Sequence, residues 1–396
     1  MWATVDLDAV RHNAGLLRHL IGTAELCAVV KADAYGHGDV PVARAALEGG
    51  ATWLAVALVE EGVALRQAGI DAPILLLSEP PPEGMAEAVD RRLVPTVYTV
   101  DGLESLSKVV AAGGLPPVAV QLKVDTGMHR VGADPSDVVA LAAAVAAAPG
   151  LRFGALWSHL SVADETGDDD RAFTVGQLRI LAETRAALVA AGLGPPMVHV
   201  ANSAGAIAHP GSRHDMVRCG IALYGVVPMP ALGPVLAGDP AVEGGELLRP
   251  VLSLRALVTH VRWLDAGERP SYGRRRELER RSLVATVPLG YADGVPRRYG
   301  AAGGTVLVGG RRCPLAGTVT MDQIVVDCGP DASVSVGDEV VLIGRQGPES
   351  LTVWDWATVL GTIGNEVLTE IGSRVPRVVV DTEPPHGVPD EEERTT

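Results

Sequence analysis

Short apolar runs alternate with alanine-rich amphipathic segments along the first half of the chain. Eight of these runs predict β-strands, at residues 26–30, 52–56, 73–77, 95–99, 118–124, 152–157, 197–200 and 215–219. Helical patterns separate most of them, and alternating β and α units predict a parallel sheet with right-handed crossovers. Eight units favour a closed (β/α)8 barrel over an open doubly wound sheet, because no GxGxxG turn follows the first strand.

The pattern changes after a stretch rich in proline and glycine, at residues 226–250. Beyond it, short β-prone runs separated by Gly, Pro or Asp predict an antiparallel β-domain, with one helical segment at residues 352–372. We therefore predict an α/β barrel domain over residues 1–235 and a mostly-β domain over residues 236–380. Residues 381–396 are acidic and indicate a solvated, disordered tail.

Composition narrows the function. The chain has 396 residues, 47% of them hydrophobic, and a formal net charge of −15. This charge argues against nucleic acid as a partner, since phosphate binding needs clustered Lys and Arg. We expect a cytoplasmic protein without a membrane contact, because the start lacks the basic and apolar parts of a secretory signal and the apolar run 138–151 is short for a membrane span. That run predicts a buried helix.

Four cysteines lie far apart without a CxxC spacing: Cys27, Cys219, Cys313 and Cys328. Free thiols in a reducing compartment are the simplest interpretation, and we expect no metal site.

Lys31 follows the first predicted strand directly and lies where a barrel would have its mouth. Burial or a nearby cation would favour its neutral amine, which can then attack a carbonyl compound. The blander interpretation is a lysine whose stem packs while its ammonium group reaches water. On Lys31 alone, that second interpretation is favoured.

Two later segments favour chemistry at the same mouth. Asn202 and Ser203 open a helical stretch after the seventh strand, where Ser203 could cap the helix and bind a phosphate. Arg218 ends the eighth strand and is followed by the backbone amides of Gly220 and Ile221. Each feature alone is as well explained by a helix cap or a surface arginine. Together they lie where (β/α)8 barrels bind phosphate.

Further candidate residues lie at the ends of other predicted strands or in turns. In isolation Lys123 could belong to an ion pair and His159 to the core, and Tyr272 and Tyr291 lie in turns, where tyrosines commonly pack. Without more information these residues would be assigned to structure alone.

Eight motifs in the same order resemble those of the alanine racemases, which are pyridoxal 5'-phosphate (PLP) enzymes built from a barrel and a β-domain. The motifs are AVVKADAYGHG, KVDTGMHRVG, HVANSAG, MVRCGIALYG, SYGRR, PLGYADG, TVTMDQIVVD and IGSRVPR. They span nearly the whole chain, and eight of them in register are specific.

The resemblance implies two bases on opposite faces of a bound amino acid. Lys31 would carry PLP and act on one face, and Tyr272 from the partner subunit would act on the other. Racemisation requires this arrangement in any case, because a proton leaves one face and another returns to the opposite face. The shared site implies a head-to-tail homodimer. The product, D-alanine, would serve peptidoglycan synthesis.

The resemblance also implies roles for the remaining site residues. Arg218 would donate to the pyridine nitrogen, which must then stay unprotonated. The other cofactor-binding residues would be Tyr35, His159, Asn202, Ser203, Gly220 and Ile221. The substrate would meet Arg130, Tyr291, Met321 and Asp322, of which Met321 and Asp322 come from the partner. Lys123 resembles a position that is often carbamylated, and the added negative charge would orient Arg130.

One position departs from the family pattern. Asn365 stands where the family usually has a tyrosine, before the Glu-Val of the last helix. Asparagine is smaller and carries both donor and acceptor groups. A racemase that accepts serine or another small amino acid therefore stays open beside alanine.

Two other functions stay open on the sequence. A barrel-type PLP decarboxylase would share the barrel but would not need a second base such as Tyr272. A non-catalytic PLP-binding protein would resemble the barrel alone.

Overall fold

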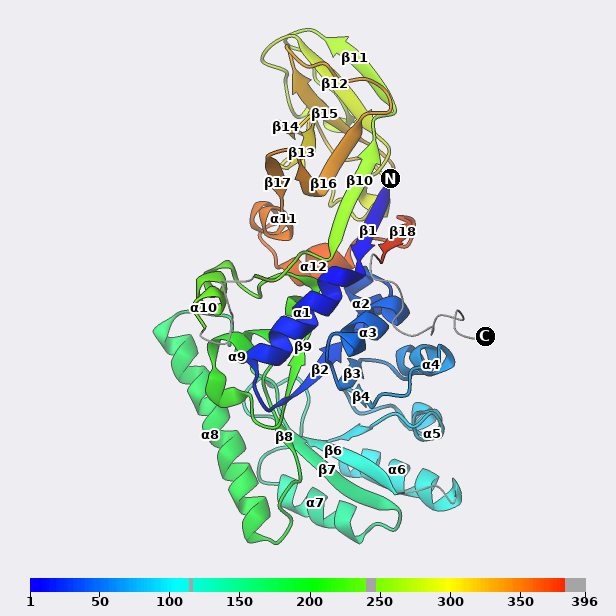
Figure 1. The fold of residues 1–396 in the computed structure, drawn as a ribbon, viewed down its shortest axis with the longest axis vertical. Helices are drawn as coiled ribbons and strands as arrows, with labels where there is room; N and C mark the ends of the chain where they lie inside the picture. Colours follow the sequence, from blue (N-terminus) through cyan, green and yellow to red (C-terminus); the bar gives the residue numbers. More distant parts are fainter. Residues whose placement is uncertain (114–116, 240–246, 382–396) are drawn as a thin grey trace, which may run out of the picture.

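The computed structural model describes residues 1–113, 117–239 and 247–381, and Figure 1 shows a barrel with a second, β-rich domain stacked on it. Eight parallel strands form the barrel: β2 (Glu25–Val29), β3 (Trp53–Val56), β4 (Ile74–Leu76), β5 (Thr96–Val97), β6 (Val118–Lys123), β7 (Leu151–Trp157), β8 (Val198–His199) and β9 (Met216–Cys219). Their order is β4-β3-β2-β9-β8-β7-β6-β5. A parallel bridge between Leu75 and Val94 brings the two ends together, so the predicted barrel is confirmed.

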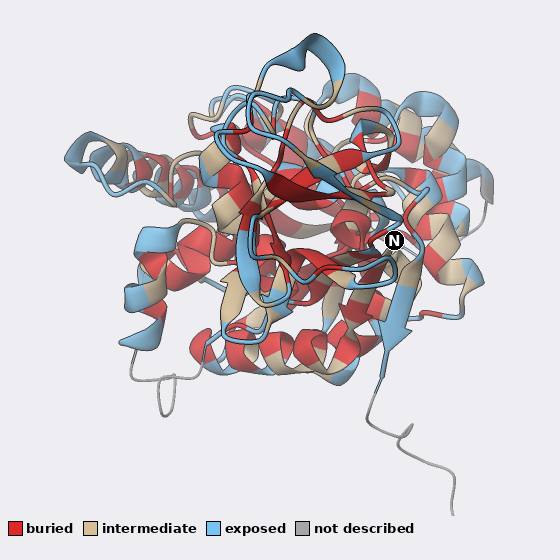
Figure 2. Ribbon diagram, turned by 90° about the horizontal axis from the view of Figure 1, so that it is seen from above, coloured by how far each residue is buried: buried red, intermediate tan, exposed pale blue. Residues whose placement is uncertain are grey.

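Ten helical segments alternate with the barrel strands among the described residues, and the longer ones cover the outside of the barrel. They are α1 (Leu7–Leu20), α2 (Lys31–Gly36), α3 (Asp39–Glu48), α4 (Val59–Gln67), α5 (Pro82–Asp90), α6 (Val100–Gly113), α7 (Val138–Ala147), α8 (Asp168–Ala190), α9 (Ser203–Ala208) and α10 (Gly233–Ala237). Figure 2 shows buried residues gathered in the interior and exposed residues on the outer faces. The apolar run 138–151 is only half buried, because the outer face of α7 carries exposed alanines. No helix among the described residues is long and apolar enough to cross a membrane.

The second domain is mostly antiparallel, as predicted. Its strands are β10 (Leu252–Leu257), β11 (His260–Leu264), β12 (Ser282–Val287), β13 (Thr305–Val308), β14 (Arg311–Pro314), β15 (Ile324–Gly329), β16 (Glu339–Gln346), β17 (Glu349–Leu351) and β18 (Arg377–Val380). The predicted helical segment forms two helices, α11 (Val353–Leu360) and α12 (Gly364–Thr369). Gly361 ends the first of them with a left-handed conformation, φ 64°.

The N-terminal strand lies in the β-domain, although the sequence predicted that residues 1–235 form the barrel domain. β1 (Trp2–Asp6) pairs antiparallel with β10 and parallel with β18, so it belongs to the sheet of the β-domain. The chain then enters α1 and the barrel. Figure 1 shows α12 between the two domains, where it packs against α2. The predicted tail lies outside the described residues, apart from residue 381.

Candidate active site

Lys31 begins α2, directly after β2, at the carboxyl end of a barrel strand. The next four residues, Ala32 to Tyr35, have φ between 51° and 54°, so they form a left-handed turn. None of them is glycine, and a left-handed conformation costs roughly 1–2 kcal/mol per residue for other amino acids. The turn after Lys31 is therefore strained, and the surrounding structure must hold it.

Two side chains outside the turn hold it in place. The Glu61 carboxylate accepts hydrogen bonds from the backbone N–H groups of Ala32, at 2.6 Å, Ala57, at 2.8 Å, and Leu58, at 3.0 Å. Arg377, from the β-domain, donates to the carbonyl of Gly36 at 2.8 Å. The sequence interpretation missed both residues. Arg377 nevertheless closes the quoted motif IGSRVPR, and Glu61 follows the second predicted strand, near the start of a helical segment.

The surroundings of Lys31 favour its neutral amine. Burial lowers the pKa of Lys31, and the charge of Arg130 lowers it further, while Glu61 acts in the opposite direction. Arg130 itself lies exposed in the segment after β6. The structure thus places Lys31 and Arg130 within electrostatic reach of each other.

Arg218 lies on β9 and is 2% exposed. Its guanidinium donates to the carbonyls of Ser158, at 2.7 Å, and Val200, at 3.1 Å. It also lies 2.5 Å from Nδ1 of His199 and 3.3 Å from Nδ1 of His159. Burial lowers the pKa of Arg218 to about 10, which still leaves it charged at neutral pH. Arg218 and His159 are thus in contact.

The surroundings of the two histidines beside Arg218 favour their neutral forms. Burial lowers the pKa of His159 and of His199 well below the ordinary value, and the Arg218 charge adds to both effects. Gln121 Oε1 lies 2.8 Å from Nε2 of His199, so His199 uses that nitrogen as the donor. Its Nδ1 is then the acceptor that faces Arg218. Gln121 and His199 are functional neighbours that the sequence interpretation missed.

Lys123 lies on β6, close to Arg218. Its Nζ lies 4.1 Å from the centre of the Trp157 ring, and the guanidinium of Arg218 lies 4.5 Å from the same ring. Burial lowers the pKa of Lys123 to about 7, with further contributions from Arg218 and Arg130. An amine with this pKa is largely neutral in mildly alkaline solution.

A second part of the site lies around Ser203. Its hydroxyl oxygen accepts from the backbone N–H groups of Gly220, at 3.0 Å, and Ala222, at 3.3 Å. A Cβ added to Gly220 would lie 2.3 Å from the hydroxyl oxygen of Tyr35, so a larger residue there would displace the Tyr35 ring. The prediction that Ser203 caps the helix is wrong. Asn202 is the cap, because its side chain accepts from the N–H of Gly205 at 2.9 Å.

The candidates in the β-domain differ, because their side chains reach solvent. Tyr272 is 70% exposed, Met321 51% and Tyr291 42%. The backbone carbonyl of Tyr272 accepts from the Thr318 hydroxyl at 2.8 Å. Among the residues that the structure describes, none forms a hydrogen bond with the Tyr272 hydroxyl. Asp322 forms an ion pair with Arg374 at 2.9 Å, so its carboxylate is engaged within its own domain.

Comparisons with known proteins agree with this geometry. Residues 5–228 match the family model for the N-terminal domain of alanine racemase, and residues 251–379 match that for the C-terminal domain. The chain is 45% identical over 378 residues to the alanine racemase of Symbiobacterium thermophilum, covering 95% of this chain and 96% of that protein.

Solved structures with the same fold include the alanine racemase of the D-cycloserine producer Streptomyces lavendulae. The TM-score is 0.87 at 40% identity, covering 96% of this chain and 97% of that one. The alanine racemase of Bacillus anthracis with bound L-Ala-P matches with a TM-score of 0.87 at 36% identity, covering 96% and 95%.

Proposed function

The chain belongs to the alanine racemase family, and we propose that it interconverts L- and D-alanine with two bases on opposite faces of the bound amino acid. The Lys31 amine serves one face, and the Tyr272 hydroxyl of a second subunit serves the other. Opposed bases allow a proton to leave one face and another to return to the opposite face. The D-alanine formed would supply peptidoglycan synthesis.

The residues at the barrel mouth fit PLP. The Nε of Arg218 is buried and has no hydrogen-bond partner among the described residues, so it remains available as a donor. Gly220 lies beside Tyr35 and Ser203, and a Cβ there would meet the Tyr35 hydroxyl. Lys31 would carry the cofactor, Arg218 would face its pyridine nitrogen, and Ser203, Gly220 and Tyr35 would hold its phosphate. Bound PLP supplies an electron sink for the substrate carbanion.

The barrel residues around Lys31 prepare it for proton transfer. A base must be unprotonated before it can accept a proton, and burial together with Arg130 favours the neutral amine of Lys31. Glu61 holds the backbone at Ala32 and thereby fixes the direction in which Lys31 leaves its strand. Arg130 would receive the substrate carboxylate. This assignment is what the family resemblance implies, and the charge of Arg130 acts on both Lys31 and Lys123.

The observation that carries the proposal is the 70% exposure of Tyr272 in a single chain. A second chain packed over Tyr272 would exclude water from its hydroxyl. We therefore propose a homodimer in which each barrel receives Tyr272 and Met321 from its partner.

A mixing experiment tests the shared site. Lys31→Ala and Tyr272→Phe are each expected to be inactive as homodimers. When the two are unfolded together and refolded, half the dimers carry one intact site, so about a quarter of the wild-type rate should return. Rates that stay at the level of the separate variants, with mixed dimers confirmed by native mass spectrometry, would show that both bases belong to one chain.

A serine-accepting racemase remains the second candidate, because Asn365 is half-buried on α12, which packs against the turn after Lys31. The measurement that separates the two is turnover of L-Ser against L-Ala under the same conditions. A decarboxylase or a non-catalytic carrier is disfavoured by the match of residues 251–379 to the C-terminal domain of alanine racemase.

We also propose that Lys123 is carbamylated. Carbon dioxide adds only to a neutral amine, and burial lowers the pKa of Lys123 to about 7. The carbamate would place a negative charge between Arg218 and Arg130. A mass increase that fits one added carbon dioxide, mapped to Lys123 under native conditions and absent in Lys123→Met, is the expected result.

A further inference from the structure

Two cysteines face each other in the β-domain, outside the site described above. Cys313 lies on β14 and Cys328 on β15. An antiparallel bridge between Leu315 and Val326 places Cys313 opposite Cys328, with both side chains on the same face of the two strands. The two thiols are thus cross-strand neighbours, and each shifts the pKa of the other.

The other two cysteines show why this pairing is unusual. Cys27 and Cys219 also lie on neighbouring strands, β2 and β9. In the register of these strands Cys27 pairs with Arg218, whereas Cys219 pairs with Ala28. A shift of one residue turns side chains to opposite faces of a sheet. Cys27 and Cys219 therefore point away from each other, and they provide an internal control.

Cys313 and Cys328 open onto a cavity of about 320 Å³, although each residue is only 4% exposed. Four arginines line this cavity, Arg276, Arg280, Arg311 and Arg312, together with four acidic residues. The hydrogen bond from Cys328 lowers the pKa of Cys313, and the charge of Arg311 lowers it further. The same bond and burial raise the pKa of Cys328. Cys313 is thus the thiol that forms a thiolate first.

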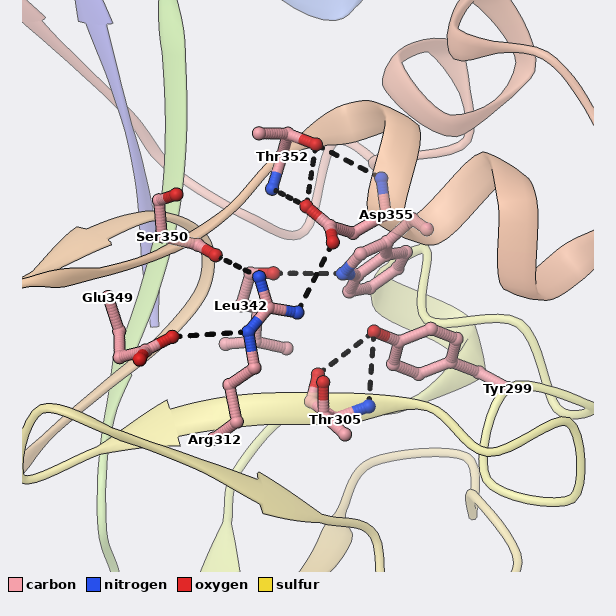
Figure 3. Close-up of polar contacts among 9 residues, drawn as sticks. Tyr299, Thr305, Arg312, Leu342, Glu349, Ser350, Thr352 and Asp355 are labelled. Carbon is pink, nitrogen blue, oxygen red and sulfur yellow. Dashed lines mark hydrogen bonds and ion pairs between the residues drawn. The ribbon is translucent and has the colours of Figure 1, made fainter.

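The strand that carries Cys313 is held firmly. Figure 3 shows Arg312, which precedes Cys313 on β14, between Glu349, Ser350 and Asp355. It forms ion pairs with Glu349 at 3.3 Å and Asp355 at 3.2 Å, and it donates to the carbonyl of Ser350. These contacts fasten β14 to β17 and α11.

The residues next to the thiols hold the segment that carries Tyr272. Arg276 lies four residues after Tyr272 and donates to the carbonyl of Leu315, two residues from Cys313. The same guanidinium pairs at 3.3 Å with Asp327, the neighbour of Cys328. Leu278 packs with Val284 and Ala316 in a small separate core. Movement of β14 against β15 would thus move the anchors of this segment.

We propose that Cys313 and Cys328 form a reversible disulfide when they meet a small-molecule disulfide, and that this bond slows racemisation by moving the anchors of the Tyr272 segment. The second half of the proposal rests on the proposed role of Tyr272, whereas the first half does not.

The exchange takes two steps that balance. The Cys313 thiolate, its proton having gone to solvent, attacks one sulfur of the reagent RSSR. A Cys313–S–S–R bond forms, the reagent's S–S bond breaks, and RS⁻ leaves. Cys328 then loses its proton and attacks the sulfur of Cys313, which displaces the second RS⁻. The protein gives up two electrons and two protons, and the reagent is reduced to two thiols.

The experiment treats the PLP-loaded wild type with hydroxyethyl disulfide, an uncharged reagent, and then blocks the remaining thiols by alkylation. Peptide mapping by mass spectrometry is expected to find Cys313 linked to Cys328, with Cys27 and Cys219 still alkylated after denaturation. Dithiothreitol should reverse the link. Cys313→Ser and Cys328→Ser should each fail to form it, while Tyr272→Phe should form it as the wild type does.

Racemisation is measured on the same samples. Oxidation should lower the wild-type rate roughly tenfold, since small misplacement of a catalytic group costs this much or more, and dithiothreitol should restore it. The rate of Cys313→Ser should not respond. A wild type that carries only separate alkylated thiols or only mixed disulfides overturns the proposal. A complete Cys313–Cys328 bond with an unchanged rate overturns the coupling to Tyr272.

Discussion

The barrel and the β-domain prepare their parts of the site in different ways. In the barrel, one chain buries Lys123 and Arg218 and half-buries Lys31, and burial lowers the pKa of each. In the β-domain, Tyr272 and Met321 remain exposed. The comparison teaches that a single chain brings the proposed cofactor-binding residues together, whereas the proposed second base, Tyr272, lies exposed and would need another chain to enclose it.

The physical cause of the difference is topology. The carboxyl ends of eight parallel strands converge on one mouth, so residues from β2, β6, β7 and β9 meet there within one chain. The antiparallel strands of the β-domain have no such common end. Tyr272 is positioned instead by local contacts, through Thr318 and Ser271.

Tyr272→Phe tests the β-domain half and has the largest expected effect. Loss of the hydroxyl should lower turnover by roughly 10³-fold, as expected for removal of a general acid or base. Because the side chain is exposed, the free energy of unfolding of the monomer should change by less than about 0.5 kcal/mol. Racemisation rates and urea unfolding measure both quantities. A variant that keeps its turnover would remove the second base from the comparison.

Lys123→Met tests the barrel half of the site by removing the titratable amine of Lys123. The folded-state pKa of Lys123 is about 7, below the ordinary value of 10.5. Below pH 7 the folded protein therefore holds a buried cation that the unfolded chain keeps in water, and this cost fades as the pH rises from 7 towards 10.5.

In carbon-dioxide-free buffer at about pH 6, the methionine variant should thus be roughly 2–4 kcal/mol more stable than the wild type. The advantage should shrink steadily above pH 7 in urea unfolding curves. The same measurement in bicarbonate provides the control, since a carbamate would remove the buried cation. An advantage that does not depend on pH would contradict the neutral amine.

Glu61→Gln tests how the strained turn after Lys31 is held in place. The amide keeps the size of the side chain but loses the charge that accepts three backbone N–H groups. We expect a loss of about 2 kcal/mol in the free energy of unfolding. The pKa of Lys31 should fall further, because Glu61 raises it.

Glu60→Gln is the matched control for Glu61→Gln, since Glu60 is the exposed neighbour on the same helix. Urea unfolding gives the stability of both variants, and the pH dependence of cofactor attachment gives the shift at Lys31. Equal behaviour of the two variants would show that Glu61 does not hold the turn.

Asn365→Tyr has the smallest expected effect and acts where the two domains meet. The larger side chain on α12 should reduce the space beside the turn after Lys31 and lower the ratio of L-Ser to L-Ala turnover by about 3–10-fold. Stability should change little. Steady-state kinetics with both substrates measure the ratio, and Thr369→Val, on the same helix, serves as a control for general disturbance. An unchanged ratio would show that position 365 does not limit the pocket.

Part of the site could be predicted from the sequence because its residues lie in short contiguous strings. The string AVVKADAYGHG contains both Lys31 and Tyr35, and MVRCGIALYG contains both Arg218 and Gly220. The roles of Glu61 and Arg377 were missed because the groups that they hold lie far away along the chain. Glu61 lies 29 residues from the amide of Ala32 that it holds, and Arg377 lies 341 residues from the carbonyl of Gly36.

By itself, the sequence determined the fold class, the eight barrel strands and the family, since hydrophobic periodicity and motif strings are local properties of the chain. Only the tertiary structure decided that β1 joins the β-domain, that Asn202 and not Ser203 caps α9, and that Ala32 to Tyr35 turn left-handed. It also decided which two cysteines lie opposite each other on neighbouring strands. These features depend on register and on contacts between distant residues, and such contacts are set when the chain packs.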